Sequence, residues 1–195
     1  PADTQETVTL NVAASPTPHA EILQQCVPIL AEQGIDLQIH EYSDYVVPNT
    51  AVEVGEGVTM YCCTDNVTEA QREGFVSLLH LSGLLEEMDE KLLDVGSAVA
   101  GCGGAFACLM LEALADGGVY AGLPRATAQR YAAQMLLGTA KLALEKGEHT
   151  GAMKDAICSP GGTTIAGVRV LEQRGFRAAA MDAVIAAYER TSQLK

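Results

Sequence analysis

The pattern of hydrophobic residues changes near residue 90, and this change constrains the fold more than any other feature of the chain. Before it, apolar residues alternate in short runs, as in Thr7–Ala14 and Ile35–Tyr42, which is typical of strands with one buried face. From Lys91 onward the alternation stops, and an alanine-rich sequence with helical spacing runs between glycine and proline breaks. The sequence therefore predicts a small, truncated α/β layer over residues 1–90 and an all-α part over residues 91–195.

The first part is expected to contain β-α-β units whose connections are long enough for parallel crossovers. The predicted strands are 7–14, 35–42, 58–63 and 84–88, and the predicted helices are 20–33 and 68–81, the second capped by Asn66 or Thr68. In the second part, helices are predicted over 91–116, from Pro124 to Gly147, over 164–174 and over 177–193, with a short turn at 152–157.

The predicted helices are apolar around much of their circumference. Four helices cannot bury all of this apolar surface among themselves. Burial against a second copy of the chain is the economical solution, so we expect a homodimer. Gly101, Gly103 and Gly104 weaken the first helix by about 1 kcal/mol each relative to alanine. Their presence suggests that another backbone or a ligand passes close to that helix.

Net charge and composition exclude several classes of binding partner. A net charge of −13 and a sequence pI near 4.6 repel phosphate backbones and anionic lipids, so we expect neither nucleic acid nor a membrane as partner. No signal-peptide pattern and no apolar run of about eighteen residues is evident, which predicts a cytoplasmic protein. Six cysteines without a CxxC pair and four scattered histidines predict small buried thiols and no metal site.

The segment Cys158–Thr164, hereafter the Pro-Gly-Gly corner, carries the strongest chemical signal. A Pro-Gly-Gly turn that leads threonines into a helix start aims free backbone N–H groups at one point, where the positive end of the helix dipole attracts an anion. Glycine lets a carboxylate or phosphate come close to the backbone. The same residues also describe a tight turn with a threonine N-cap, and the residues alone leave both interpretations open.

Several motifs occur together and in one order: Ala100-Gly-Cys-Gly-Gly-Ala-Phe106, Glu112-Ala-Leu-Ala-Asp-Gly-Gly118, Gly122-Leu-Pro-Arg125, Ala132-Ala-Gln134, Gly147-Glu-His149, Lys154-Asp155 and the Pro-Gly-Gly corner. With these motifs the chain, from about Pro48 to Leu194, resembles the C-terminal half of pyrroline-5-carboxylate reductase. The resemblance implies reduction of 1-pyrroline-5-carboxylate to L-proline with NADP or NAD as cofactor, in proline biosynthesis. It also implies an interlocked homodimer whose interface builds the pocket for a small imino or amino acid.

Carried over residue by residue, the resemblance implies that the substrate carboxylate is held by Ser159, Gly161, Gly162, Thr163 and Thr164. Thr164 is a candidate proton donor to the product nitrogen, with water as the alternative. The resemblance further implies that Gly101 and Gly103 lie beside the nicotinamide and that Asn49 contacts the cofactor. The chain departs from the family pattern at Ala100, Gly104 and Val47, where relatives usually carry serine, proline and methionine.

The N-terminal segment of the chain resembles a different family. Leu10–Asn49, with Ala14-Ser-Pro-Thr-Pro-His-Ala-Glu-Ile-Leu23, resembles the first β-α-β of methionine-binding lipoproteins of the NlpA type. The two resemblances meet at Pro48–Ala51, which predicts a fusion, or chimera. The glycine-rich turn that binds a dinucleotide is missing from this front segment. We therefore expect an impaired enzyme, and a chain without this turn can lack bound cofactor altogether. The alternative is a non-catalytic dimerisation or small-acid-binding module; methionine binding through His19 and Tyr45 is a weaker third reading.

Overall fold

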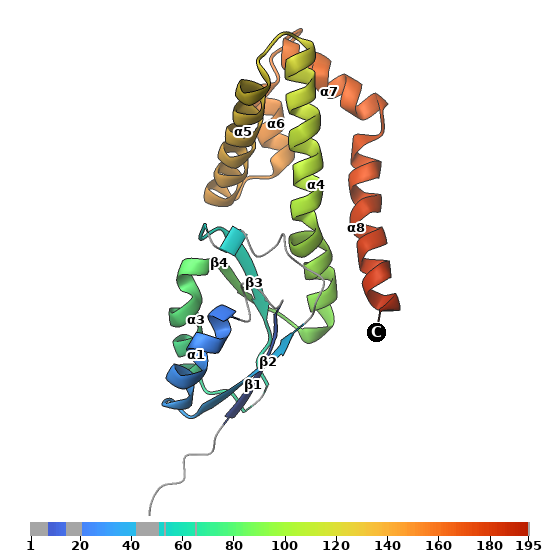
Figure 1. Cartoon of the computed structure of the whole chain (residues 1–195). Helices are drawn as coiled ribbons and strands as arrows, with labels where there is room; N and C mark the ends of the chain where they lie inside the picture. Colours follow the sequence, from blue (N-terminus) through green and yellow to red (C-terminus); the bar gives the residue numbers. More distant parts are fainter. Residues whose placement is uncertain (1–7, 15–20, 42–50, 53, 65, 195) are drawn as a thin grey trace, which may run out of the picture. The chain divides into compact units, whose positions relative to one another are not determined.

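The computed structural model describes residues 8–14, 21–41, 51–52, 54–64 and 66–194 (Figure 1). The chain divides into two compact units. The N-terminal unit comprises Pro1–Gly104 with Thr191–Lys195, and the helical unit comprises Ala105–Arg190. The expected architecture, a small α/β part followed by an all-α part, is confirmed.

The N-terminal unit contains two β-α-β repeats. In the first, β1 (Val8–Ala14) and β2 (Ile35–Glu41) pair in parallel from Val8 opposite Ile35 to Ala14 opposite Glu41, with α1 (Glu21–Ala31) between them in the chain. In the second, β3 (Gly57–Tyr61) and β4 (Gly83–Glu87) pair in parallel around α3 (Glu69–Leu79). Short 3₁₀ turns follow α3 at His80–Ser82 and precede the first long helix at Glu90–Leu92. All four predicted strands are confirmed, each within two residues of its expected start.

The hydrophobic core of this unit lies between the helices α1 and α3 and the strands. Its buried members are Leu23, Leu30, Ile35, Leu37 and Phe75. The Phe75 ring meets the Tyr61 ring edge-on, with centroids 5.2 Å apart, a favourable aromatic geometry. The alternation of apolar residues in β2 thus serves its expected purpose, since Ile35 and Leu37 point to one face.

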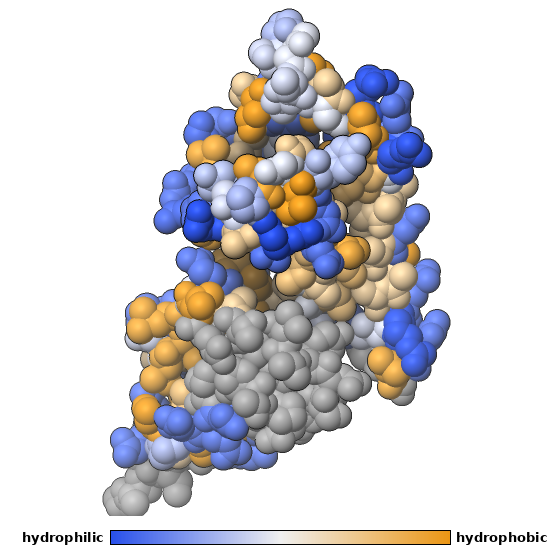
Figure 2. All heavy atoms as spheres, turned by 45° about the horizontal axis from the view of Figure 1, so that its top comes forward, coloured by the Kyte–Doolittle hydropathy of each residue, from blue (hydrophilic) through white to orange (hydrophobic). Residues whose placement is uncertain are grey.

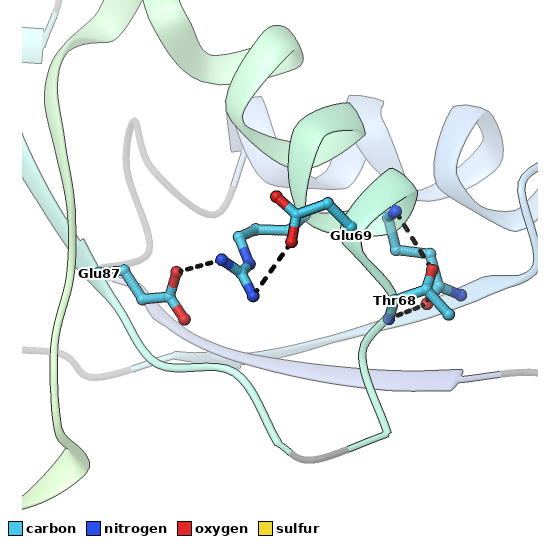
Figure 3. Close-up of polar contacts among 5 residues, drawn as sticks. Thr68, Glu69 and Glu87 are labelled. Carbon is cyan, nitrogen blue, oxygen red and sulfur yellow. Dashed lines mark hydrogen bonds and ion pairs between the residues drawn. The ribbon is translucent and has the colours of Figure 1, made fainter.

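Polar contacts fix the start of α3 and join it to β4 (Figure 3). Thr68 caps the helix: its hydroxyl accepts a hydrogen bond from the Gln71 N–H, and the Gln71 side chain accepts one from the Thr68 N–H at 2.9 Å. This decides between the two predicted caps in favour of Thr68. The Arg72 guanidinium lies between Glu69 and Glu87, 3.4 Å from each carboxylate.

The helices of the second part are α4 (Leu93–Tyr120), α5 (Arg125–Lys146), α6 (Thr150–Ile157), α7 (Thr163–Gln173) and α8 (Phe176–Gln193). The prediction that the first helix ends at Gly117-Gly118 was wrong, because α4 continues to Tyr120. Gly118 faces α5, where an added Cβ would lie 3.2 Å from the Ala128 Cβ, so Gly118 allows close helix packing, whereas a Cβ on Gly117 would meet nothing within 4 Å. The chain turns instead at Gly122, which has φ +102°.

Two further boundaries in the structure differ from the predicted ones. Residues predicted as a short turn at 152–157 form the two-turn helix α6, because His149 caps it and Met153 is buried. Residues 93–104 of α4 group with the N-terminal unit, where Gly96 packs so closely on the Met60 sulfur of β3 that a Cβ would overlap it. The proposed division into 1–90 and 91–195 stays a prediction.

The core of the N-terminal unit can be tested at Leu30, whose side chain is only 1% exposed. Leu30→Ala should lower the free energy of unfolding by about 3 kcal/mol, because it leaves a cavity among packed side chains. The neighbouring Ile29 is 45% exposed, so Ile29→Ala is a matched control that should cost less than about 1 kcal/mol. Urea denaturation followed by circular dichroism measures both; equal losses would contradict this core.

Candidate functional site

The Pro-Gly-Gly corner joins α6 to α7 as a defined hydrogen-bonded turn. The Gly162 N–H donates to the Ser159 carbonyl at 3.0 Å, which closes the four-residue turn Ser159–Gly162. Pro160 is its second residue and Gly161, with φ +69°, its third, the residue order of a type II turn. A residue with a side chain is strained at that φ, so Gly161 is required by the backbone itself.

Limited space favours glycine at position 162. A Cβ added there would overlap the Ser159 hydroxyl oxygen and lie 3.1 Å from the Ser159 carbonyl oxygen. Gly162 is also the N-cap of α7, and no side chain caps this helix. Its position between the turn and the helix explains why two glycines follow each other here.

The first amides of α7 are the exposed donors of the corner. Gly162 uses its N–H within the turn, whereas no acceptor within the described part of the chain bonds the N–H groups of Thr163, Thr164 and Ile165. Ser159, Gly161, Thr163 and Thr164 are exposed and Gly162 is half-buried. The structure therefore brings all five predicted substrate residues together on one turn. It also removes the Gly162 amide from the expected donors.

The charged groups near the corner form ion pairs with one another. Lys154 pairs with Asp155, and the hydrogen bond that its ammonium donates to the Asp155 carboxylate raises the pKa of Lys154. Arg177 Nε lies 2.7 Å from a Glu172 carboxylate oxygen at the junction of α7 and α8. Across the turn between α4 and α5, Arg125 pairs with Asp116. Lys154 and Arg177 are thus each paired with a carboxylate.

The predicted cofactor residues belong to the N-terminal unit, whereas the corner belongs to the helical unit. Gly101 and Gly103 lie within α4 in the N-terminal unit; a Cβ on Gly101 would meet only Ser97 Oγ of the same helix, and one on Gly103 would meet nothing within 4 Å. An added Cβ at either position would meet no other described segment within 4 Å, and the nearness of these glycines to a ligand or a second backbone stays a prediction. Asn49 lies outside the described residues.

The N-terminal unit contains a small cavity beside Arg72, lined also by Tyr61, Cys63, Gln71 and Phe75. It has room for about one water molecule, too little for a substrate or cofactor. Burial, and then the neighbouring charge of Glu87, raise the pKa of the Cys63 thiol, so Cys63 is protonated at neutral pH.

The described residues offer little that could hold a metal or span a membrane. No cluster of three or more His, Cys, Asp or Glu side chains has the arrangement of a metal site there. One stretch, Glu90–Tyr120, is long and apolar enough to cross a membrane by length and composition. A single such helix is weak evidence for a membrane span.

The sequence analysis gave no role to His149, the N-cap of α6. Its imidazole Nδ1 accepts a hydrogen bond from the Gly151 N–H at 3.0 Å. The available signal was its place two residues after Gly147, which ends α5 with φ +62°. Histidine is not among the preferred N-cap residues, so composition alone did not reveal this contact.

The turn geometry gives a direct prediction. Gly161→Ala should lower the free energy of unfolding by about 1 kcal/mol, because alanine is strained at positive φ. Gly167 of α7 is the matched control: it has helical backbone and nothing within 4 Å of an added Cβ, so Gly167→Ala should stabilise by up to about 1 kcal/mol. Thermal unfolding distinguishes the two signs; stabilisation by both variants would contradict the turn.

Comparison with known proteins identifies the family of this chain. A model of the family "Pyrroline-5-carboxylate reductase dimerisation" matches residues 90–194, and a model of the "NlpA lipoprotein" family matches residues 10–60. The chain is 49% identical over 174 residues to the pyrroline-5-carboxylate reductase of Synechocystis, with 86% of this chain and 64% of that protein covered. It is 40% identical over 148 residues to the Escherichia coli enzyme, with 76% and 55% covered.

Solved structures agree. The Plasmodium falciparum pyrroline carboxylate reductase with NADP bound matches 72% of this chain and 57% of its own at 34% identity and a TM-score of 0.66. The Coxiella burnetii enzyme, at 22% identity, shares the fold over 96% of this chain and 76% of its own with a TM-score of 0.73. The chain spans little more than half the length of several curated relatives it matches. On this evidence the chain belongs to the pyrroline-5-carboxylate reductase dimerisation family.

Proposed function

We propose that this chain serves the reduction of 1-pyrroline-5-carboxylate to L-proline, and that the Pro-Gly-Gly corner holds the substrate carboxylate. The observation that carries this proposal is the set of exposed, unbonded amides of Thr163, Thr164 and Ile165 directly after a type II turn. These donors and the helix dipole favour a small anion at the start of α7. The family relationship supplies the substrate class, and the cytoplasm is the proposed location.

Each residue of the corner has a distinct part in the proposed site. The amides of Thr163 and Thr164 donate to the carboxylate, and Gly161 and Gly162 keep the approach free of side chains. The Thr164 hydroxyl is the proposed proton donor to the product nitrogen, with water as the alternative. NADPH or NADH, where bound, supplies the hydride that reduces the carbon–nitrogen double bond of the imine.

The residues present do not fit a dinucleotide pyrophosphate held on a glycine turn. That grip requires glycines between a strand and the next helix, but the sequences between β1 and α1 and between β3 and α3 contain none. This chain by itself therefore has no such grip for the cofactor. The same observation favours a second candidate function, a non-catalytic module that dimerises and binds a small acid at the corner.

A homodimer is the proposed assembly, because apolar side chains line the outside of the helical unit (Figure 2). Met181, Ile185 and Tyr188 of α8 are spaced one turn apart and are 61%, 51% and 40% exposed. On α5, Tyr131 and Met135 are one turn apart and Leu142 follows two turns later, and all three are also exposed. Apolar stripes of this kind are expected to be covered in a stable assembly.

Two measurements on the full chain separate the candidate functions. Saturable oxidation of NADPH in the presence of 1-pyrroline-5-carboxylate supports the reductase. Binding of L-proline without NADPH oxidation supports the small-acid module. If the reductase is active, Thr164→Ala should lower kcat about a hundredfold while Thr164→Ser retains most activity, since a positioned proton donor contributes on this scale. Unchanged kcat in Thr164→Ala would leave water as the proton donor, and absence of both activities would contradict the carboxylate site.

The dimer has its own test. Size-exclusion chromatography with light scattering should give twice the chain mass of 20.5 kDa. Ile185→Glu should shift the equilibrium towards the monomer, because it places a charge in the apolar stripe of α8. Gln129→Glu adds the same charge at an exposed polar position of α5 and should leave the dimer intact. A wild-type mass of one chain at micromolar concentration would contradict the proposed assembly.

A further inference from the structure

One residue satisfies the first amides of α6. The imidazole Nδ1 of His149 accepts a hydrogen bond from the Gly151 N–H at 3.0 Å, and the His149 carbonyl accepts from the Ala152 N–H at 2.9 Å and from the Met153 N–H at 3.3 Å. Since Nδ1 is the acceptor, the proton of the neutral ring lies on Nε2. His149 thus supplies both the side-chain cap and the first backbone acceptors of the helix.

The helix that His149 caps has few other contacts to hold it. With residues Thr150–Ile157, α6 is eight residues long, too short to be stable by itself in water. Met153 is its one buried residue, and its remaining residues are half-buried or exposed. The cap and the burial of Met153 therefore determine where this helix lies.

Consecutive backbone hydrogen bonds lead from α6 to the Pro-Gly-Gly corner. The Cys158 N–H donates to the Asp155 carbonyl at 3.1 Å, and the Gly162 N–H donates to the Ser159 carbonyl at 3.0 Å. The Ala166 N–H then donates to the Gly162 carbonyl at 3.4 Å, within the first turn of α7. No flexible loop separates the end of α6 from the exposed amides of α7, so a shift of α6 moves those amides.

We propose that His149 is a positioning residue for the anion corner: its imidazole cap fixes α6, and α6 fixes the turn that presents the amides of Thr163 and Thr164. The inference rests on the proposed function for what the corner binds. The capping itself rests on the contacts of His149 alone.

The neighbouring Gly151 makes the proposal sharply testable. A Cβ added to Gly151 would lie 2.9 Å from Nδ1 and 3.0 Å from Cε1 of His149. The imidazole can turn away at little steric cost, but it then loses the hydrogen bond. Glycine to alanine normally stabilises a helix. Here Gly151→Ala should weaken the cap while His149 is present, and should stabilise α6 in a His149→Ala background where no imidazole is in the way.

The experiment is amide hydrogen exchange by NMR on the full chain, read at Cys158 and Gly162. His149→Ala should speed their exchange about 2- to 30-fold, the range expected for loss of an N-cap, and His149→Asn should restore it because asparagine is a good cap. Gly151→Ala should speed exchange, and the double variant should not be faster than His149→Ala. Thr68→Ala removes the comparable cap of α3 in the N-terminal unit and should leave both amides unchanged.

Ligand binding reports separately on the function. The affinity for L-proline should fall in His149→Ala and recover in His149→Asn. Unchanged exchange at Cys158 and Gly162 in both His149→Ala and Gly151→Ala would overturn the positioning role, as would equal acceleration by Thr68→Ala. If the wild-type chain does not bind L-proline, the carboxylate site fails, whereas the exchange rates still decide whether His149 positions the corner.

Discussion

The hydrogen bond from the Gly162 N–H to the Ser159 carbonyl is the contact on which the functional part of this molecule depends. It closes a turn that only glycine fits at Gly161, and it sets the direction in which α7 leaves the turn. It occupies one amide, and the next three amides of the helix have no acceptor within the described residues. The carboxylate site proposed for them would need no cationic side chain, which suits a chain with a net charge of −13.

The two units are stabilised in different ways. The N-terminal unit has a contiguous core of large side chains around Leu30 and Phe75. The helical unit buries mainly small ones, among them Ala115, Ala128 and Ala132, while many of its large apolar side chains are exposed. Helices that pack through alanine and glycine come close together but bury little area each. The same unit therefore has an apolar exterior and matches a dimerisation family.

The front of the chain shows how little of a fold depends on any single turn sequence. Both of its repeats are parallel β-α-β units, although neither carries the glycine turn expected of a dinucleotide site. Strand alternation and helix caps such as Thr68 are sufficient for the topology. Arg72 joins α3 to β4 through its ion pair with Glu87. Its buried Nε has no hydrogen-bond partner within the described residues and lies in a side chain that lines a cavity the size of one water molecule.

The sequence by itself determined the strands, the main helices and the Pro-Gly-Gly corner, because alternation, helical spacing and glycine or proline breaks are local signals that each segment carries alone. Tertiary structure decided the rest. Gly117 and Gly118 look like a helix end, yet α4 continues because Gly118 is needed for contact with Ala128. α6 looks like a turn, yet the imidazole of His149 and the burial of Met153 make it a helix. The approach of Gly118 to Ala128 and the burial of Met153 exist only once the chain has folded, whereas the His149 cap is a local contact made by a residue that is not among the preferred N-caps.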